Sequence, residues 1–400
     1  MHHLNAPWLT LPALQHLFSL FETAGATLRL VGGSVRDGLL NLSVSDIDFA
    51  VDRDPHWVMD LLKKNHIKVI PTGIDHGTVT AVIEKHPYQI TTLRRDVETF
   101  GRKANVAFTD DWVEDAQRRD FTMNAIYADK DGTLFDPVNG VEDLKHHRVR
   151  FIGDASLRIK EDYLRILRFF RFSARFGHEP YDAEGLKAAQ TYASHLPHLA
   201  RERVTDEFLK LMELPSPLYT LEAMSETGVL SYILHPGTWE DLKSLVIFEK
   251  ETKVSPSAML RLAAFHPLLD EVKKHLRLSR RQESELNFYS KAHPMITLDT
   301  FKQQAYRWGK ESVFNLALLQ TARSSEISPE EGVTFLNALH QQYDNWHVPP
   351  FPISGDDLLD RGVKEGHDVG RLLKAVEKWW LSKDLEPDRD ACLAHLSTLL

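Results

Sequence analysis

The sequence predicts an α+β fold in which a mixed head of strands and helices is followed by an all-helical remainder. Short β-type runs separated by turn residues fill the first third, at residues 27–31, 46–51, 67–70, 77–84 and 88–95. From about residue 155 such runs stop, and helical apolar spacing broken by prolines continues to the end. A chain of 400 residues, 42% of them hydrophobic, can build two or more domains with buried cores.

Three segments in the first half of the chain predict helices. Residues 11–25 show helical apolar spacing and stop at Gly25. Residues 34–41 fit a short helix, so the head opens with strand, turn, helix and strand. Residues 154–177 carry a strong helical pattern ending at Gly177, and we expect a single helix there.

Composition excludes several classes of protein. No run of 18 apolar residues exists, so we expect no membrane-spanning helix. The N-terminal segment lacks a basic region followed by a long apolar stretch and does not read as a secretory signal. Cys392 is the single cysteine, which rules out an intramolecular disulfide and a cysteine-based zinc site. We therefore expect a cytoplasmic protein.

The charge is unevenly distributed. The net charge of −9 argues against a nucleic-acid partner, yet residues 321–400 alone hold 14 Asp/Glu against 8 Lys/Arg. Residues 148–175 hold 8 Lys/Arg against three acids. A local basic stripe of this kind can serve a phosphate backbone even when the whole chain is acidic.

Two aspartates come after the first turn at strand spacing. Asp46 and Asp48 would project from one face of a strand, because side chains two residues apart do so. Close carboxylates take up a proton or bind a cation, and a hard, oxygen-ligated ion such as Mg²⁺ suits them best. For an isolated D-x-D, a polar turn at a strand start is the commoner explanation.

The residues before Asp46 and Asp48 favour the metal site over a polar turn. Gly32 and Gly33 allow backbone N–H groups to approach an anion closely, and Ser34 begins the predicted helix. Arg36 adds a fork of donors suited to phosphate oxygens. A phosphate cradle beside a metal-binding pair is what a nucleoside triphosphate requires, with Mg²⁺ bridging its phosphates.

The stretch "VGGSVRDGLLN…SDIDFAV" resembles the nucleotidyltransferase superfamily that includes DNA polymerase β. More narrowly, it is similar to the class II (bacterial-type) CCA-adding tRNA nucleotidyltransferases and the bacterial poly(A) polymerases. Further similar stretches occur at 72–82, 90–112, 116–129, 132–144 and 200–212, so the resemblance covers most of the first 210 residues. It implies a polymerase-β-like head at 1–145, a helical neck at 146–212 that selects the nucleotide, and a helical body and tail at 213–400 that bind tRNA.

The resemblance also implies roles for individual residues. Asp46 and Asp48 would hold Mg²⁺, and the first turn would cradle the triphosphate. In "RRDFTMNA", Arg118, Asp120 and Asn124 would bind ribose and phosphate. The implied activity is the template-independent addition of C, C and A to the 3′ end of tRNA from CTP and ATP, with release of pyrophosphate. No obligatory protein partner is evident.

Residues 161–165, "EDYLR", would select the base. On a helix, Asp162 and Arg165 share a face, and Glu161 can pair with Arg165 to hold its guanidinium still. Cytosine and adenine each present an amino donor beside a ring-nitrogen acceptor, so one protein edge with an acceptor and a donor fits both. Uracil and guanine present a carbonyl instead, at a cost of roughly 1–3 kcal/mol. On the residues alone, a solvated helical salt-bridge face is the commoner explanation of the segment. The neighbouring Arg168 is assigned to the same nucleotide site.

The chain departs from the family pattern at one position. Relatives carry a third acidic residue where this chain has Gln89, which can ligate a metal through its carbonyl but carries no charge. Asp96, Glu84 or Glu98 are alternative sources of the missing carboxylate. Three rivals therefore stay open: a bacterial poly(A) polymerase, a partial enzyme adding only C-C or only A, and a non-catalytic tRNA-binding homologue.

The helical remainder adds a second basic segment. Residues 271–291 hold 6 Lys/Arg against three glutamates. A basic helix face can grip RNA backbone phosphates through shape and charge, although a solvated surface helix explains these residues as well.

Overall fold

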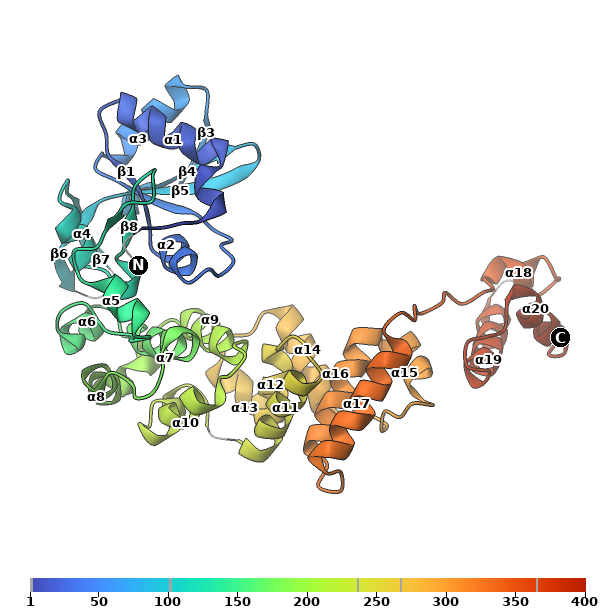
Figure 1. The fold of residues 1–400 in the computed structure, drawn as a ribbon. Helices are drawn as coiled ribbons and strands as arrows, with labels where there is room; N and C mark the ends of the chain where they lie inside the picture. Colours follow the sequence, from blue (N-terminus) through green and yellow to red (C-terminus); the bar gives the residue numbers. More distant parts are fainter. Residues whose placement is uncertain (1–2, 101–102, 236, 267, 365) are drawn as a thin grey trace. The chain divides into compact units, whose positions relative to one another are not determined.

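The computed structural model describes residues 3–100, 103–235, 237–266, 268–364 and 366–400, with the side chains of 96–106 left undescribed. Contacts divide the chain into two compact units (Figure 1). The first comprises residues 1–235 with 275–277, and the second comprises 236–274 with 278–400. The predicted head and neck therefore form one unit. The finer division at residues 145 and 212 stays a prediction.

The head contains a seven-stranded mixed sheet in the order β3-β4-β5-β2-β1-β8-β9. Only β2 and β5 run parallel, and the other neighbours pair antiparallel. A separate two-stranded hairpin is formed by β6 and β7. The strands are β1 (Leu28–Val31), β2 (Asp48–Val51), β3 (Lys68–Gly73), β4 (Thr78–Ile83), β5 (His86–Thr92), β6 (Arg94–Phe100), β7 (Lys103–Phe108), β8 (Tyr127–Ala128) and β9 (Leu134–Phe135).

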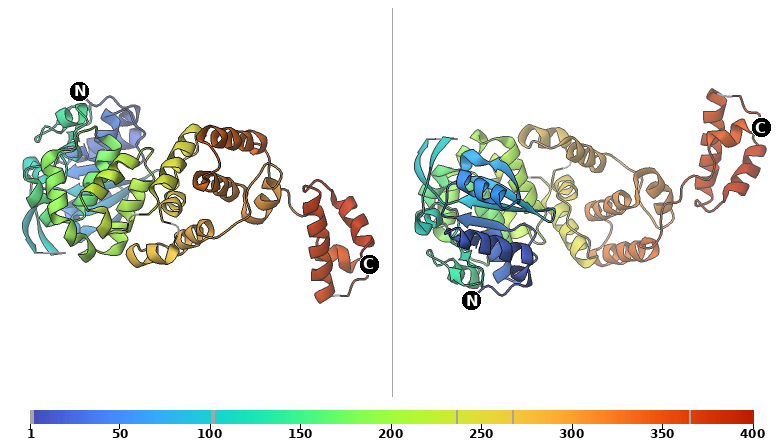
Figure 2. Two further views of the ribbon diagram at one scale, coloured as in Figure 1. Left: turned by 90° about the horizontal axis from the view of Figure 1, so that it is seen from below. Right: turned by 90° about the horizontal axis from the view of Figure 1, so that it is seen from above.

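The two faces of the sheet have different neighbours. Phe49 of β2 packs edge-on against Phe18 of α1, with ring centroids 5.4 Å apart. Helices α1 (Pro12–Thr23) and α3 (Pro55–Lys64) cover this face (Figure 1). The opposite face is turned toward the green helices of the neck, which lie in front of it when the molecule is seen from below (Figure 2). Since Asp48 precedes Phe49 on the same strand, its side chain lies on the neck side.

The structure confirms the strand, turn, helix and strand predicted at the start of the head, although the helices and strands begin or end at slightly different residues. Helix α2 (Gly33–Leu39) begins one residue before Ser34, and α1 ends before Gly25, whose φ of +74° favours glycine. The strand expected at 46–51 begins only at Asp48. The other head helices are α4 (Trp112–Gln117) and α5 (Gly140–Lys145), with 3₁₀ turns η1 (Pro7–Thr10), η2 (Ile74–His76) and η3 (Thr122–Asn124).

The single helix expected at 154–177 is wrong. The chain forms α6 (Ala155–Glu161) and α7 (Arg165–Phe176), and Asp162 between them is extended, with φ −153° and ψ 104°. The Asp162 carboxylate accepts from the Leu164 amide at 3.1 Å, which stabilises the new turn. The remaining helices of the first unit are α8 (Ala183–Tyr192), η4 (Ala193–His198), α9 (Arg201–Met212), α10 (Leu218–Glu226) and η5 (Leu230–Tyr232).

The second unit is helical throughout the described residues, as predicted. Its helices are α11 (Trp239–Glu251), α12 (Ala258–Phe265), α13 (Leu269–His275), α14 (Arg280–Ser290), α15 (Phe301–Trp308), α16 (Lys310–Arg323), α17 (Pro329–Tyr343), α18 (Gly355–Leu359), α19 (His367–Ser382) and α20 (Arg389–Ser397). A buried pair, Arg261 with Glu249 at 2.7 Å, joins α12 to α11. Among the described helices of the chain, none is long and apolar enough to cross a membrane.

Candidate active site

The glycine turn closes the end of β1. Gly32 has φ +73° and ψ −126°, a conformation that side-chain-bearing residues rarely adopt, and α2 starts at Gly33. A Cβ at Gly32 would lie 4.0 Å from the backbone oxygen of Asn124. The Ser34 hydroxyl donates back to the Val31 carbonyl at 3.3 Å, and Ser34 is buried. The serine therefore stabilises the turn, and its predicted phosphate contact stays a prediction.

The two aspartates lie where the chain enters β2. Asp48 is partly buried, whereas Asp46 is exposed and accepts from the Ser45 hydroxyl at 3.0 Å. Burial raises the pKa of Asp48, the negative charge of Asp46 raises it further, and Arg119 opposes both. The two carboxylates thus repel each other, and a bound cation would relieve that repulsion.

This donor set fits a hard divalent ion. Carboxylate oxygens are the ligands that Mg²⁺ prefers, together with substrate phosphates and water. Among the described residues, no group of three or more His, Cys, Asp or Glu side chains is placed to enclose a metal. Asp46 and Asp48 would therefore hold an ion that completes its coordination with other oxygens.

Gln89 occupies the position beside Asp48. In the parallel pairing of β2 with β5 the two residues are register partners, so their side chains share a face of the sheet. Gln89 is exposed, and on its other side it faces Thr80 of β4. The chain therefore has a neutral amide beside Asp48, where the resemblance implies a third acid. Glu84 lies exposed in the turn between β4 and β5, and the side chains of Asp96 and Glu98 are outside the described residues.

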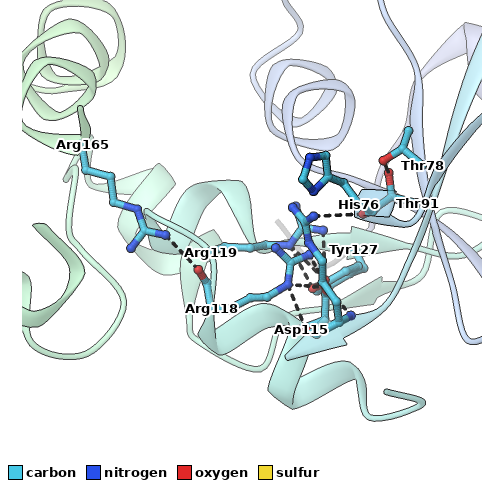
Figure 3. Close-up of polar contacts among 9 residues, drawn as sticks. His76, Thr78, Thr91, Asp115, Arg118, Arg119, Tyr127 and Arg165 are labelled. Carbon is cyan, nitrogen blue, oxygen red and sulfur yellow. Dashed lines mark hydrogen bonds and ion pairs between the residues drawn. The ribbon is translucent and has the colours of Figure 1, made fainter. Parts of the chain in front are cut away.

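Two arginines converge on a buried aspartate that the sequence patterns did not reveal (Figure 3). Asp115 accepts from Arg118 Nε at 2.9 Å and from Arg119 Nη2 at 2.9 Å, and it is 1% exposed. The Tyr127 hydroxyl donates to it at 2.7 Å. Burial alone would raise the pKa of Asp115, but the charges of Arg119 and Arg118 outweigh it and lower the pKa. The spacing of Asp115 to the arginines, three and four residues on a helix, was the available signal.

Arg119 is consequently a fixed positive charge whose field acts on Asp48. Its guanidinium is held by Asp115 and by the Tyr127 oxygen at 3.2 Å, and its charge reaches Asp48. A fixed, desolvated cation next to developing phosphate charge is a recurrent device in phosphoryl transfer. Arg118 has its Nε bonded to Asp115 and the Arg94 carbonyl, and its predicted contact with nucleotide stays a prediction.

Arg36, Asn124 and Asp120 form a buried chain of hydrogen bonds. Arg36 Nη1 donates to Asn124 Oδ1 at 2.6 Å, and Asn124 Nδ2 donates to Asp120 at 3.0 Å. Asp120 then accepts from Arg168 at 2.8 Å, which also approaches Glu207 at 3.6 Å. These predicted nucleotide ligands therefore join the head to helices α7 and α9. Their direct contact with nucleotide stays a prediction.

The "EDYLR" segment positions Arg165 by a different geometry from the one predicted. Arg165 Nη1 donates to Glu161 at 2.5 Å, which confirms the expected pair, and to the Arg158 carbonyl at 3.0 Å. Its Nη2 donates to the Arg118 carbonyl at 3.2 Å (Figure 3). Asp162 is not on a shared helical face with Arg165, and its second oxygen accepts from Arg203 at 2.6 Å.

The basic stripe at 148–175 is mostly neutralised. Its arginines pair with acids of the head and neck, which leaves Lys160 as a cation without a salt bridge among the described residues of the stripe. The pairs are Arg148 and Arg150 with Asp143, Arg158 with Glu161, Arg165 with Glu161, Arg168 with Asp120, Arg171 with Glu207, and Arg175 with Asp37. The stripe is thus chiefly a structural network and not a free phosphate-binding face.

Comparison with known proteins decides the family. Residues 28–150 match the family described as the poly A polymerase head domain, and residues 182–242 match one described as the probable RNA and SrmB-binding site of polymerase A. The mouse (Mus musculus) protein CCA tRNA nucleotidyltransferase 1, mitochondrial, is 34% identical over 394 residues, covering 96% of this chain and 89% of that protein. The chain belongs to the CCA-adding tRNA nucleotidyltransferase family.

Other members of the family are similar to this chain over nearly its whole length. The CCA-adding enzyme of Listeria monocytogenes serotype 4b (strain F2365) is 32% identical, with 95% of each chain covered. The solved structure of the Bacillus stearothermophilus CCA-adding enzyme in complex with CTP shares the fold, with a TM-score of 0.70, 24% identity, and coverage of 97% of this chain and 98% of that one. The predicted fold class and resemblance are confirmed.

Proposed function

We propose that this nucleotidyltransferase adds C, C and A to the 3′ end of tRNA from CTP and ATP and releases pyrophosphate. The observation that supports it most is the coupling of Asp46 with Asp48 behind the glycine turn, in a chain of the CCA-adding family. In the reaction, the 3′-hydroxyl of the RNA attacks the α-phosphate in line with the departing pyrophosphate.

Asp46 and Asp48 would hold Mg²⁺, the ion we propose for a family that needs a divalent metal. Bound there, the ion lowers the pKa of the attacking hydroxyl and neutralises phosphate charge. The chain's own residues supply the rest. Backbone N–H groups at Gly32 and Gly33 face the triphosphate, Arg119 holds a fixed positive charge beside Asp48, and Gln89 offers a neutral oxygen.

Arg165 has the hydrogen-bonding capacity to read a base. A guanidinium has five N–H donors, and the three bonds to Glu161, Arg158 and Arg118 leave Nε–H and one Nη2–H. Asp162 accepts from Leu164 and Arg203 and retains further lone pairs. One donor and one acceptor fit the amino and ring-nitrogen edge of cytosine and of adenine, and reject uracil and guanine.

The RNA partner would be tRNA, contacted by the helical second unit. Arg280 and Arg281 at the start of α14 are exposed, as a phosphate-contacting face requires. The proposal includes a cytoplasmic location and no obligatory protein partner. Direct nucleotide contacts by Ser34, Arg36, Arg118, Asp120, Asn124 and Arg168 are part of the same proposal, and each would require a change in the contacts described above.

The test is incubation of the protein with tRNA that lacks its terminal C-C-A, together with CTP, ATP and Mg²⁺. Addition that stops after C-C-A supports the proposal. A long A tail identifies a poly(A) polymerase, and a product ending at C-C identifies a partial enzyme. No incorporation, with Asp46→Ala equally inactive, indicates a tRNA-binding homologue.

A further inference from the structure

A stacked pair of rings lies beside the base-reading segment. Tyr163, between α6 and α7, stacks on His195 of η4 with ring centroids 4.2 Å apart and planes inclined by 4°. Both side chains are partly exposed. Tyr192 flanks the pair at 6.4 Å from Tyr163, and Lys160 Nζ lies 5.2 Å from the Tyr192 ring centroid. The result is an aromatic surface with an adjoining cation.

The same two chain segments build this surface and hold Asp162. Tyr163 is the next residue after Asp162, and Arg203, which donates to Asp162 at 2.6 Å, lies in α9 shortly after His195. The stacked pair is therefore positioned against the base-reading carboxylate by a shared junction. The Tyr163 ring therefore lies one residue along the chain from the carboxylate proposed to read the base.

The charge around the junction favours an anionic partner. Three of its acids have cationic partners, since Glu161 pairs with Arg165, Asp162 with Arg203, and Glu202 approaches Arg277 at 3.9 Å. The exposed cations Lys160 and Arg201 have no salt bridge within the described part of the chain. Partly exposed rings interleaved with such cations are the features with which proteins hold single-stranded nucleic acid.

We propose that Tyr163 and His195, with Lys160, form a platform on which an unpaired base at the 3′ end of the RNA stacks. This proposal rests on the proposed function, because it places the primer end next to the nucleotide site. The base extends the stack of rings, and Lys160 contacts the adjoining phosphate. Stacking is sequence-tolerant, as a primer that ends in different bases at successive steps requires.

The chain offers a matched control in a second stacked pair. Tyr181 and Tyr219 lie with ring centroids 5.3 Å apart and planes inclined by 4°. Tyr219 is 44% exposed. Burial raises the pKa of Tyr219, and the charges of its acidic neighbours Glu179 and Glu226 raise it further. The rings of this pair are equally parallel, and no cation–π contact to either ring occurs among the described residues, so its loss should not affect RNA binding.

The test measures binding of a fluorescein-labelled RNA hairpin with four unpaired 3′ nucleotides, and of the same hairpin with a blunt end, at fixed salt. We expect Tyr163→Ala and His195→Ala to weaken binding of the overhang hairpin about tenfold and to leave the blunt hairpin unchanged. Tyr163→Phe should retain the wild-type affinity, and so should Tyr219→Ala. In His195→Ala, which leaves residues 161–165 intact, the KM for CTP should not change.

Three results overturn the platform: unchanged overhang binding in both alanine variants, equal losses for both hairpins, or a loss in Tyr163→Phe that matches Tyr163→Ala. Thermal melting of each variant checks folding, and His195→Ala tests the pair without altering residues 161–165. CTP incorporation by the wild type on the same hairpin separates the two proposals. If incorporation fails while the overhang effect holds, the proposed function is wrong and the platform stands.

Discussion

Arg165 donates from Nη2 to the backbone carbonyl of Arg118 at 3.2 Å. This bond joins the proposed base-reading side chain to the head, since Arg118 itself donates to the Arg94 carbonyl at 2.9 Å and to Asp115. Arg94 begins the β6–β7 hairpin, and its Nη1 donates to the His76 carbonyl at 3.0 Å. The guanidinium of Arg165 is thus held from the neck by Glu161 and from the head by Arg118.

Glu161→Gln should weaken selection of the base. The substitution removes the charge that fixes Arg165 at 2.5 Å, so the guanidinium gains alternative positions. We expect the ratio of kcat/KM for CTP to that for UTP to fall about tenfold, within the range for one mismatched hydrogen-bonding edge. Glu142→Gln, on an exposed carboxylate that pairs with Lys145 in α5, is the control and should keep the ratio. An unaltered ratio in Glu161→Gln would show that this pair does not govern selection.

Gln89→Glu should tighten the metal site. The new carboxylate would stand beside Asp48 across the parallel pair and add a third negative charge. We expect Mn²⁺ titration followed by paramagnetic resonance to give a several-fold lower Kd, and the Mg²⁺ concentration for half-maximal activity to fall with it. Gln190→Glu makes the same exchange at an exposed position of α8 and should leave both values unchanged. If Gln89→Glu also leaves them unchanged, position 89 is not a third ligand.

Arg168→Ala should destabilise the first unit. It leaves Asp120, only 9% exposed, without its main counter-charge, which typically costs about 3 kcal/mol for a buried pair. Urea-dependent hydrogen exchange of residues 120–128 and 165–176 measures the loss locally. Arg148→Ala is the control, because Asp143 keeps Arg150 and the Thr122 hydroxyl, and we expect a cost below about 1 kcal/mol. Equal effects in the two variants would contradict the importance of the Asp120 pair.

Acid should destabilise the first unit through Asp115. Burial opposes ionisation, but the charges of Arg119 and Arg118 prevail and lower the pKa of Asp115 below its usual value. A depressed carboxyl pKa contributes stability above the unfolded pKa, near about 4, and that stability is lost as the pH falls toward the folded pKa. Asp115→Asn should therefore lower Tm at neutral pH and flatten its decline below about pH 4. A decline as steep as in the wild type would assign the acid sensitivity to other groups.

Much of the fold was readable from the sequence because local patterns and tertiary structure agree there. The alternation of short strands with turns is visible within short stretches of sequence. The end of α1 is also local, because a glycine stands where the backbone takes a φ of +74°. The break at Asp162 was not readable, since the apolar spacing runs unbroken from α6 into α7. The extended residue is stabilised by Arg203, 41 positions away.

In the candidate site, too, local features were predicted from the sequence and features that depend on distant contacts were not. The pairing of Glu161 with Arg165 is local and was predicted correctly. The placement of Gln89 next to Asp48 depends on the parallel pairing of β2 with β5, which single-chain patterns do not specify. Asp115 was missed because a charged residue on a short helix looks like an ordinary solvent-exposed residue until the fold buries it.

The central claim, that one active site performs all three additions and then stops, is tested most directly by single-nucleotide incorporation on three tRNAs. These tRNAs end before C-C, after C-C and after C-C-A. With CTP alone, the first should gain two residues and the others none. With ATP alone, only the second should gain one residue, and Asp46→Ala should abolish every addition. Repeated A addition to the third tRNA, or activity that survives in Asp46→Ala, would contradict the account.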